Sequence, residues 1–114
     1  MRRDSERLSD IIEAAGKIAA RVARGRETFD ADEDTQIVLV HLIQVIGEAA
    51  AGLSDEFVSE HSEIPWRQIV AVRNRVVHGY FEVDLDILWD VAAVDVPRLA
   101  DQVGVIRSKF ADES

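Results

Sequence analysis

The sequence has no cysteine among its 114 residues. This absence excludes disulfide bonds, thiolate nucleophiles and cysteine-ligated zinc, and it is typical of proteins in a reducing cytoplasm. Long apolar runs are also missing, since none approaches the roughly 20 residues that cross a bilayer. The first six residues, MRRDSE, contain no apolar segment of the kind that signal peptides carry. We therefore expect a soluble, cytoplasmic protein without a membrane segment.

Loops and spacings that hold phosphates or metals are absent too. There is no glycine-rich phosphate loop. The three histidines (His41, His61 and His78) have no metal-ligand spacing, and the acidic run from Asp30 to Asp34 lacks the glycine and distal glutamate of a calcium loop. We expect neither a metal nor another cofactor.

Positive charge is scarce, because 13 basic residues stand against 22 acidic ones and the formal net charge is −9. That balance argues against a general nucleic-acid binder. The charge is uneven, however: residues 27–63 hold ten acids and no lysine or arginine, whereas residues 64–81 hold three arginines and no acid. Arginine suits bidentate phosphate contacts. Charge alone leaves open whether residues 64–81 bind a phosphate or form an ordinary solvated surface.

Apolar periodicity predicts helices almost throughout. The expected helices cover residues 5–24, capped by Asp4 or Ser5 and by Gly25; residues 32–52; a short turn after Ser54; residues 65–77; a helix after Asp84; and a last one carrying Leu99 to Phe110, after a break or kink near Asp95 and Pro97. Residues 26–32 are expected to be a polar connection. The fold class is an all-α bundle of four to five helices, in one domain over residues 1–114.

The helix expected over residues 32–52 is apolar on most sides and would need cover all round. A chain of this length has difficulty covering it alone, so we expect a second copy to do so, in a homodimer. The polar residues His41, Gln44 and Glu48 share one face of this helix.

The helix expected over residues 65–77 contains the candidate site. Arg73 falls in the middle of its apolar stripe, where an arginine is costly unless paired. Asn74 and His78 are four residues apart, and a loosened last turn before Gly79 would bring His78 toward Arg73, with Tyr80 beside them.

These residue types suit phosphodiester cleavage without a metal. Histidine can exchange protons near neutral pH, arginine can hold phosphate oxygens, asparagine can orient either group, and tyrosine can stack on a base. Structural interpretations fit as well: His78 could face a helix dipole, and Arg73 could pair with Glu48. That pairing is also compatible with catalysis, because the carboxylate would fix the guanidinium.

The segment Arg73 to Tyr80, RNRVVHGY, resembles the R-x-x-x-x-H-x-Y motif of HEPN domains, and of HepT-like toxins in particular. Arg, His and Tyr at this spacing would arise by chance in roughly one of 400 chains of this composition. The segments IGEAA from Ile46, IPW from Ile64, YFEVD from Tyr80, ILW from Ile87 and DVP from Asp95 also resemble that family.

The resemblance implies a homodimeric, metal-independent ribonuclease, with the motifs of both subunits in a shared cleft. Arg73 and His78 would be catalytic, Asn74 would assist, and the RNA ends would be a 2′,3′-cyclic phosphate and a 5′-hydroxyl. The implied partner is a minimal nucleotidyltransferase antitoxin that transfers AMP to Tyr80. We expect further that Glu48 supports Arg73, and that Arg67 and Arg75 attract RNA.

Two other functions remain open on the sequence. A non-catalytic HEPN module could present a substrate to a nucleotidyltransferase, although Arg73, His78 and Tyr80 together favour an enzyme. A purely structural bundle without any site is the third interpretation.

Overall fold

The computed structural model describes residues 3–78 and 82–113. The chain runs through these elements in order: α1 (Asp4–Val22), α2 (Arg26–Ala31), α3 (Glu33–Ala51), α4 (Asp55–Glu60), α5 (Trp66–Val70), α6 (Val72–Val76), β1 (Val77–His78), β2 (Glu82–Val83), α7 (Leu85–Asp90), the π-helical turn η1 (Val91–Asp95) and α8 (Val96–Glu113). The expected all-α architecture is confirmed.

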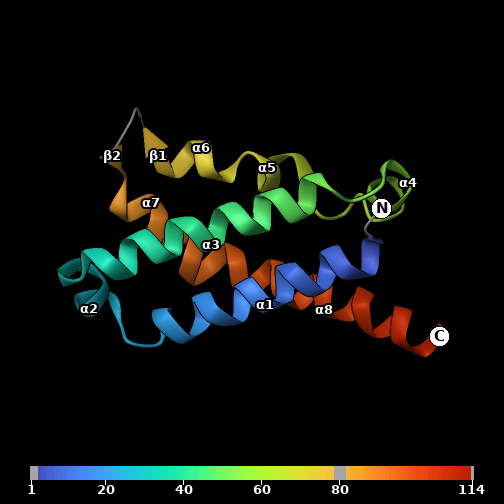
Figure 1. Ribbon diagram of the computed structural model, residues 1–114, viewed down its shortest axis with the longest axis horizontal. Helices are drawn as coiled ribbons and strands as arrows, with labels where there is room; N and C mark the ends of the chain where they lie inside the picture. Colours follow the sequence, from blue (N-terminus) through green and yellow to red (C-terminus); the bar gives the residue numbers. More distant parts are fainter. Residues whose placement is uncertain (1–2, 79–81, 114) are drawn as a thin grey trace.

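The long helices lie side by side, with α3 between α1 on one side and the short pair α5–α6 on the other, while α8 packs against α1 (Figure 1). Apolar side chains from nearly every element meet between them. The largest fully buried ones are Leu8, Ile11, Ile18, Phe29, Leu39, Ile43, Ile46, Ile64, Val76, Leu88, Val91 and Val103. This core holds α3, and with it the site described below, in place.

Three of the expected helix starts carry side-chain caps, at Asp32, at Ser54 and, as predicted, at Asp84. Asp32 accepts hydrogen bonds from the backbone N–H of Asp34 and from the hydroxyl of Thr35, and the latter chiefly lowers the pKa of Asp32. This cap therefore stabilises the folded protein fully when the pH is above the ordinary pKa of aspartate. The stabilisation is lost as the pH falls through the lowered pKa of Asp32. Ser54 caps α4, and Asp84 caps α7 by accepting from the N–H of Ile87.

The start of α1 differs from the prediction. Arg3 is the N-terminal boundary residue and gives no side-chain cap. Asp4 instead lies inside the helix and accepts two hydrogen bonds from Ser54, one from its N–H at 2.9 Å and one from its hydroxyl at 2.7 Å. The carboxylate thus ties α1 to the loop after α3. Gly25, expected to end α1, has a φ of 94° and precedes α2 directly.

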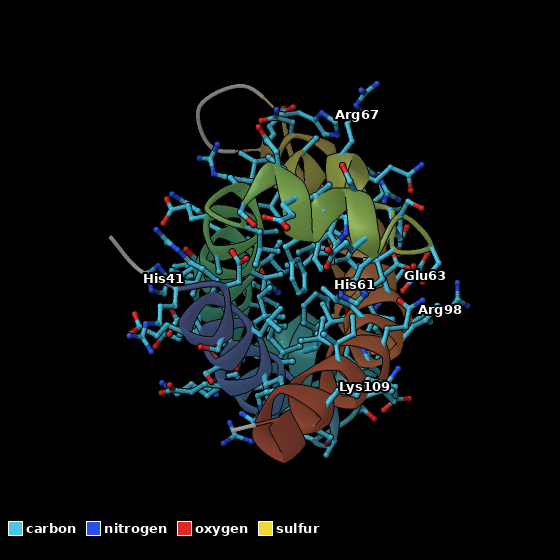
Figure 2. All side chains as sticks on the ribbon, turned by 90° about the vertical axis from the view of Figure 1, so that its right-hand side faces the viewer. His41, His61, Glu63, Arg67, Arg98 and Lys109 are labelled. Atoms are coloured by element: carbon cyan, nitrogen blue, oxygen red, sulfur yellow. The ribbon has the colours of Figure 1, made fainter. Side chains whose placement is uncertain are left out.

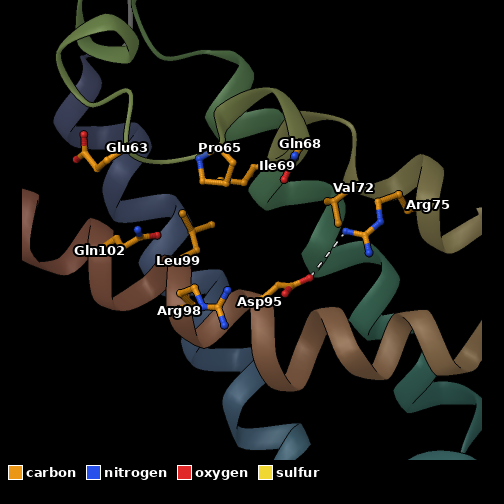
Figure 3. A pocket seen from close by; sticks show the side chains of 10 residues that line it. All are labelled: Glu63, Pro65, Gln68, Ile69, Val72, Arg75, Asp95, Arg98, Leu99 and Gln102. Carbon is orange, nitrogen blue, oxygen red and sulfur yellow. Dashed lines mark ion pairs between the residues drawn. The ribbon is translucent and has the colours of Figure 1, made fainter.

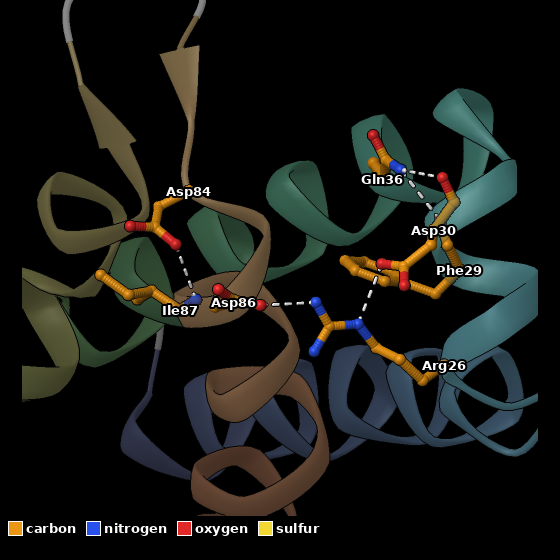
Figure 4. A network of polar contacts seen from close by, with 7 residues as sticks. All are labelled: Arg26, Phe29, Asp30, Gln36, Asp84, Asp86 and Ile87. Atoms are coloured by element: carbon orange, nitrogen blue, oxygen red, sulfur yellow. Dashed lines mark hydrogen bonds and ion pairs between the residues drawn. The ribbon is translucent and has the colours of Figure 1, made fainter.

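Residues 26–32 are not a polar connection but contain the helix α2. Its one large apolar residue, Phe29, is buried against Trp89 with the ring centroids 5.2 Å apart. Arg26 lies over both rings and donates to Asp30 and to Asp86 of α7, at 2.9 and 2.6 Å (Figure 4). Both hydrogen bonds raise the pKa of Arg26, and the one to Asp86 has the larger effect. A single buried ring has no periodicity, which explains why the sequence pattern missed this helix.

The helix expected over residues 65–77 is also interrupted. It breaks at Ala71 into α5 and α6, and it ends at Val76, where the chain turns into a two-stranded antiparallel hairpin with Val77 opposite Val83 and His78 opposite Glu82. Consecutive β-branched valines favour extended backbone. Near Pro97, by contrast, the expected break is the π-helical turn η1, since proline cannot donate the hydrogen bond of a regular turn.

Gly47 allows α3 and α5 to approach each other closely. A Cβ on Gly47 would lie 3.3 Å from the carbonyl oxygen of Val70 and 3.4 Å from that of Ile69. Both contacts are with backbone, which cannot rotate away as a side chain can. The short helix α5, and α6 after it, are therefore seated on α3 at this residue.

We predict that Gly47→Ala lowers the free energy of unfolding, although alanine favours helix by about 1 kcal/mol over glycine. The methyl group must push α5 off α3, and overpacking costs roughly 1–3 kcal/mol. Gly16→Ala is the matched control, because Gly16 is exposed in α1 with open space around it. It should stabilise the protein. Urea unfolding followed by circular dichroism compares the two, and equal stabilisation by both would contradict the close approach.

Candidate active site

The helix α6 presents three consecutive polar residues to solvent. Val72 and Val76 are buried, at 8% and 1% exposure, and anchor the helix on one side. Arg73, Asn74 and Arg75 are all exposed. The expectation that Arg73 lies in a buried stripe is therefore wrong, because the break at Ala71 puts α6 out of phase with the apolar pattern of α5.

Arg73 and Asn74 share a hollow with Glu48 of α3. This hollow, which we call the Glu48 hollow, has a volume of about 240 Å³ and is lined by Ile43, Gln44, Gly47, Glu48, Ala51, Val70, Val72, Arg73 and Asn74. The Gln44 amide donates to the Glu48 carboxylate at 3.1 Å. The structure thus brings together three of the residues singled out in the sequence.

The ion pair between Arg73 and Glu48, one of the structural alternatives considered from the sequence, is not formed. Within residues 3–78 and 82–113, the Arg73 guanidinium has neither a salt-bridge nor a hydrogen-bond partner. A guanidinium without such a partner keeps all five of its N–H donors for a ligand. Its structural role is thus small, and its capacity to bind an anion is large.

Arg73 also borders a second, larger hollow on its other side. This Ile37 hollow, of about 480 Å³, is lined by Glu33, Gln36, Ile37, Val40, Arg73, Val77, Val83 and Leu85. Ile37 is 57% exposed at its edge. The sequence predicted incomplete cover for α3, and Ile37 is where the helix leaves a large apolar side chain in solvent.

The sequence predicted His78 on the last turn of a helix, but His78 lies in β1. Its side chain is exposed, and Glu82 is its neighbour across the hairpin. It lines neither the Glu48 hollow nor the Ile37 hollow. Tyr80 and Gly79 lie outside the described residues. The expected helical position of His78 is therefore wrong, because α6 ends at Val76, whereas the gathering of Arg73, Asn74, His78 and Tyr80 around one spot stays a prediction.

The other two arginines of residues 64–81 point in different directions. Arg67 on α5 extends away from the bundle into solvent (Figure 2). Arg75 faces η1, where its guanidinium lies 3.8 Å from the carboxylate of Asp95. Arg73 and Arg75 thus flank α6 on opposite sides.

No group of three or more His, Asp or Glu side chains among the described residues could hold a metal ion. Over the same residues, no helix combines the length and apolar character needed to span a bilayer.

Sequence reasoning missed the side of α6 that faces α8. Arg98 and Gln102 lie four residues apart after Pro97 and flank a hollow together with Arg75. The four-residue spacing of these two polar residues, which places them on one face of the helix, was the available signal.

Comparison with known proteins gives a consistent result. The family described as "Ribonuclease HepT-like" matches residues 11–106. The chain is 35% identical over 81 residues to a "Probable ribonuclease HepT" of Thermococcus cleftensis, covering 71% of this chain and 74% of that protein.

Two further relatives are named as candidate RNases. One, from Caldanaerobacter subterraneus, is 35% identical over 83 residues, covering 73% of this chain and 74% of its own. The other, from Methanocaldococcus jannaschii, is 28% identical over 93 residues, which cover 82% of this chain and 72% of that protein. No solved structure gives a significant match. The family match spans most of the helical bundle and includes α6 and the hairpin, and this chain belongs to the HepT-like ribonuclease family.

Proposed function

We propose that this protein is a metal-independent endoribonuclease and the toxin of a toxin–antitoxin pair. The observation that carries the proposal is the exposed Arg73 guanidinium, which lacks a partner among the described residues and lies beside Asn74 and Glu48. Such a guanidinium suits a phosphate oxygen. Membership of a ribonuclease family supports RNA as the source of that phosphate.

In the proposed reaction, the 2′-oxygen of a ribose attacks the adjacent phosphorus, and the bond from phosphorus to the 5′-oxygen breaks. A neutral His78 imidazole takes the proton of the 2′-hydroxyl, and a protonated His78 gives one to the leaving 5′-oxygen. Arg73 stabilises the charge that builds on the phosphorane oxygens. The products are a 2′,3′-cyclic phosphate and a 5′-hydroxyl.

Supporting roles follow from the arrangement around Arg73. Asn74 can hydrogen-bond the phosphate or His78, and Glu48 lines the same hollow, so its carboxylate can orient the guanidinium when RNA binds. Arg67 and Arg75 would add local attraction for the RNA strand against the net charge of −9.

A homodimer would supply the two imidazoles that the proton transfers require. Ile37 and Val70, 57% and 44% exposed, border the two hollows on either side of Arg73. Apolar side chains left in solvent around a polar site favour a protein contact. A two-fold axis near Arg73 would cover them and would place both copies of His78 at one cleft.

His78→Ala should reduce RNA cleavage at least about 100-fold, as expected for the loss of a general acid or base. Arg73→Ala should have a similar effect, and Arg73→Lys should recover only part of the rate, because lysine lacks the bidentate fork. The measurement is cleavage of labelled RNA in the presence of a chelator. All three variants should keep the parent's unfolding curve, since both side chains are exposed.

Arg107→Ala is the matched control, because Arg107 is an exposed arginine on α8 that lines none of the described hollows. It should cleave at the parent's rate. Full activity of His78→Ala would rule out the mechanism, whereas a parent protein that cleaves no RNA would favour the non-catalytic binding module.

Ile37→Glu should convert the dimer into a monomer in sedimentation velocity and should abolish cleavage, because a charge would be buried in the dimer contact. Val105→Glu is the control: Val105 is 60% exposed on α8 and borders neither hollow. This variant should stay dimeric and active. Identical behaviour of the two variants would place the dimer contact elsewhere.

The proposed antitoxin is a minimal nucleotidyltransferase that modifies Tyr80, the single tyrosine of the chain. The phenol oxygen attacks the α-phosphorus of ATP, a tyrosine–phosphate bond forms, and pyrophosphate leaves. The added phosphates would bring negative charge into the site and repel RNA.

Incubation with such an enzyme and ATP should raise the mass of the protein by multiples of an AMP residue and should stop RNA cleavage. Peptide mass spectrometry should assign the adduct to Tyr80, and Tyr80→Phe should remain unmodified. An adduct on a serine, threonine or histidine would overturn this assignment.

A further inference from the structure

One side of the helical bundle is open. Whereas α5 and α6 pack on α3, a hollow of about 450 Å³ separates them from η1 and α8 (Figure 3). This α8 groove is lined by Glu63, Pro65, Gln68, Ile69, Val72, Arg75, Asp95, Arg98, Leu99 and Gln102. A smaller hollow, bordered by Ile69, Val72 and Leu99 as well, continues inward to the core residues Ile43 and Ile46.

The walls of the α8 groove combine apolar and polar side chains. Ile69, Val72 and Leu99 face one another across it, while Gln68 and Gln102 flank them from opposite sides (Figure 3). The formal charges of the groove sum to zero, because two guanidiniums (Arg75 and Arg98) and two carboxylates (Glu63 and Asp95) line it. Such a groove fits an uncharged planar group with several hydrogen-bonding edges better than a free phosphate.

The position of the α8 groove relative to Arg73 suggests where that group comes from. Arg73 borders the hollows on the α3 side of α6, and Arg75 borders the groove on the α8 side. A single strand that crosses the short helix α6 would meet one guanidinium on each side. Proteins that recognise single-stranded RNA commonly hold an unstacked base in a pocket beside the bound backbone.

We propose that the α8 groove binds a base next to the cleaved linkage and that it prefers adenine. This inference rests on the proposed ribonuclease function. The glutamine amide can pair with adenine at two atoms, donating to N7 and accepting from the exocyclic amine. The carboxylates of Glu63 and Asp95 accept further hydrogen bonds from an amine, which uracil lacks. Adenine should therefore bind best and uracil worst.

The first test is binding by the wild-type protein and needs no catalysis. Adenosine, cytidine, guanosine and uridine are titrated separately in NMR experiments that observe the side-chain amides of Gln68 and Gln102 and the methyl groups of Ile69, Val72 and Leu99. Adenosine should shift these signals at the lowest concentration and uridine at the highest. Absent shifts, or equal shifts with uridine, would overturn the inference.

The second test is base preference in cleavage. Gln102→Leu keeps the volume of the side chain but removes its hydrogen bonds, and it should reduce the preference for adenine beside the cut at least fivefold in a randomised RNA pool. Gln68→Leu should act in the same direction. Asp101→Asn is the control, since Asp101 is exposed on α8 beside Gln102 and does not line the groove.

Failure of the two proposals can be told apart. A wild-type protein that cleaves no RNA overturns the proposed function, while the nucleoside titration still tests the base site. Cleavage with unchanged base preference in both glutamine variants overturns the base site alone. Gln68→Leu and Gln102→Leu proteins that dissociate into monomers would identify the α8 groove as a contact between subunits and would overturn the inference as well.

Discussion

The contact between Gly47 and the carbonyl oxygens of Ile69 and Val70 determines where the site can form. Helices of five residues, such as α5 and α6, have too few internal hydrogen bonds to be stable alone. They keep their shape because α3 supports them, and α3 in turn is held by the core it shares with α1. A glycine at the contact lets the backbones meet, and so Arg73 and Asn74 lie over Glu48 at the same hollow.

The charges near α6 matter more for a bound ligand than the net charge of the whole chain. The net charge of −9 would repel RNA at long range, but the acids of residues 27–63 lie mainly at the start of α3 and around α4. At α6, by contrast, the polar surface is made of two arginines and an asparagine. At 0.1 M salt the screening length is about 10 Å, so charges farther away than this contribute little. At cellular ionic strength, a ligand at α6 would therefore respond mainly to the charges around it, those of Arg73 and Arg75 and of the neighbouring carboxylates of Glu48 and Asp95.

The long helices could be predicted from the sequence because each repeats its apolar positions over many turns, as α1 and α3 do. Short elements carry no such signal, so α2, held by the single ring of Phe29, and the break at Ala71 were missed. The same limit applies to the site. Arg73, Asn74 and Glu48 were recognised, and the structure brings them together. The orientation of Arg73 and the strand position of His78 depend on where a five-residue helix ends, which no periodicity encodes.

The π-helical turn η1 has a consequence for the register of α8. A regular α-helix turns by about 100° per residue, and a π-helical turn accommodates one residue more than an α-helical turn. If residues 91–95 were regular α-helix instead, the extra residue would therefore rotate every side chain from Val96 onward by about 100° relative to α7. Leu99, Val103 and Ile106 would leave the core together, and Arg98 would turn away from α6. The π-helical turn thus fixes the rotation of α8 about its own axis. It keeps the apolar side chains of α8 toward the core and its polar side chains along the open side of the bundle.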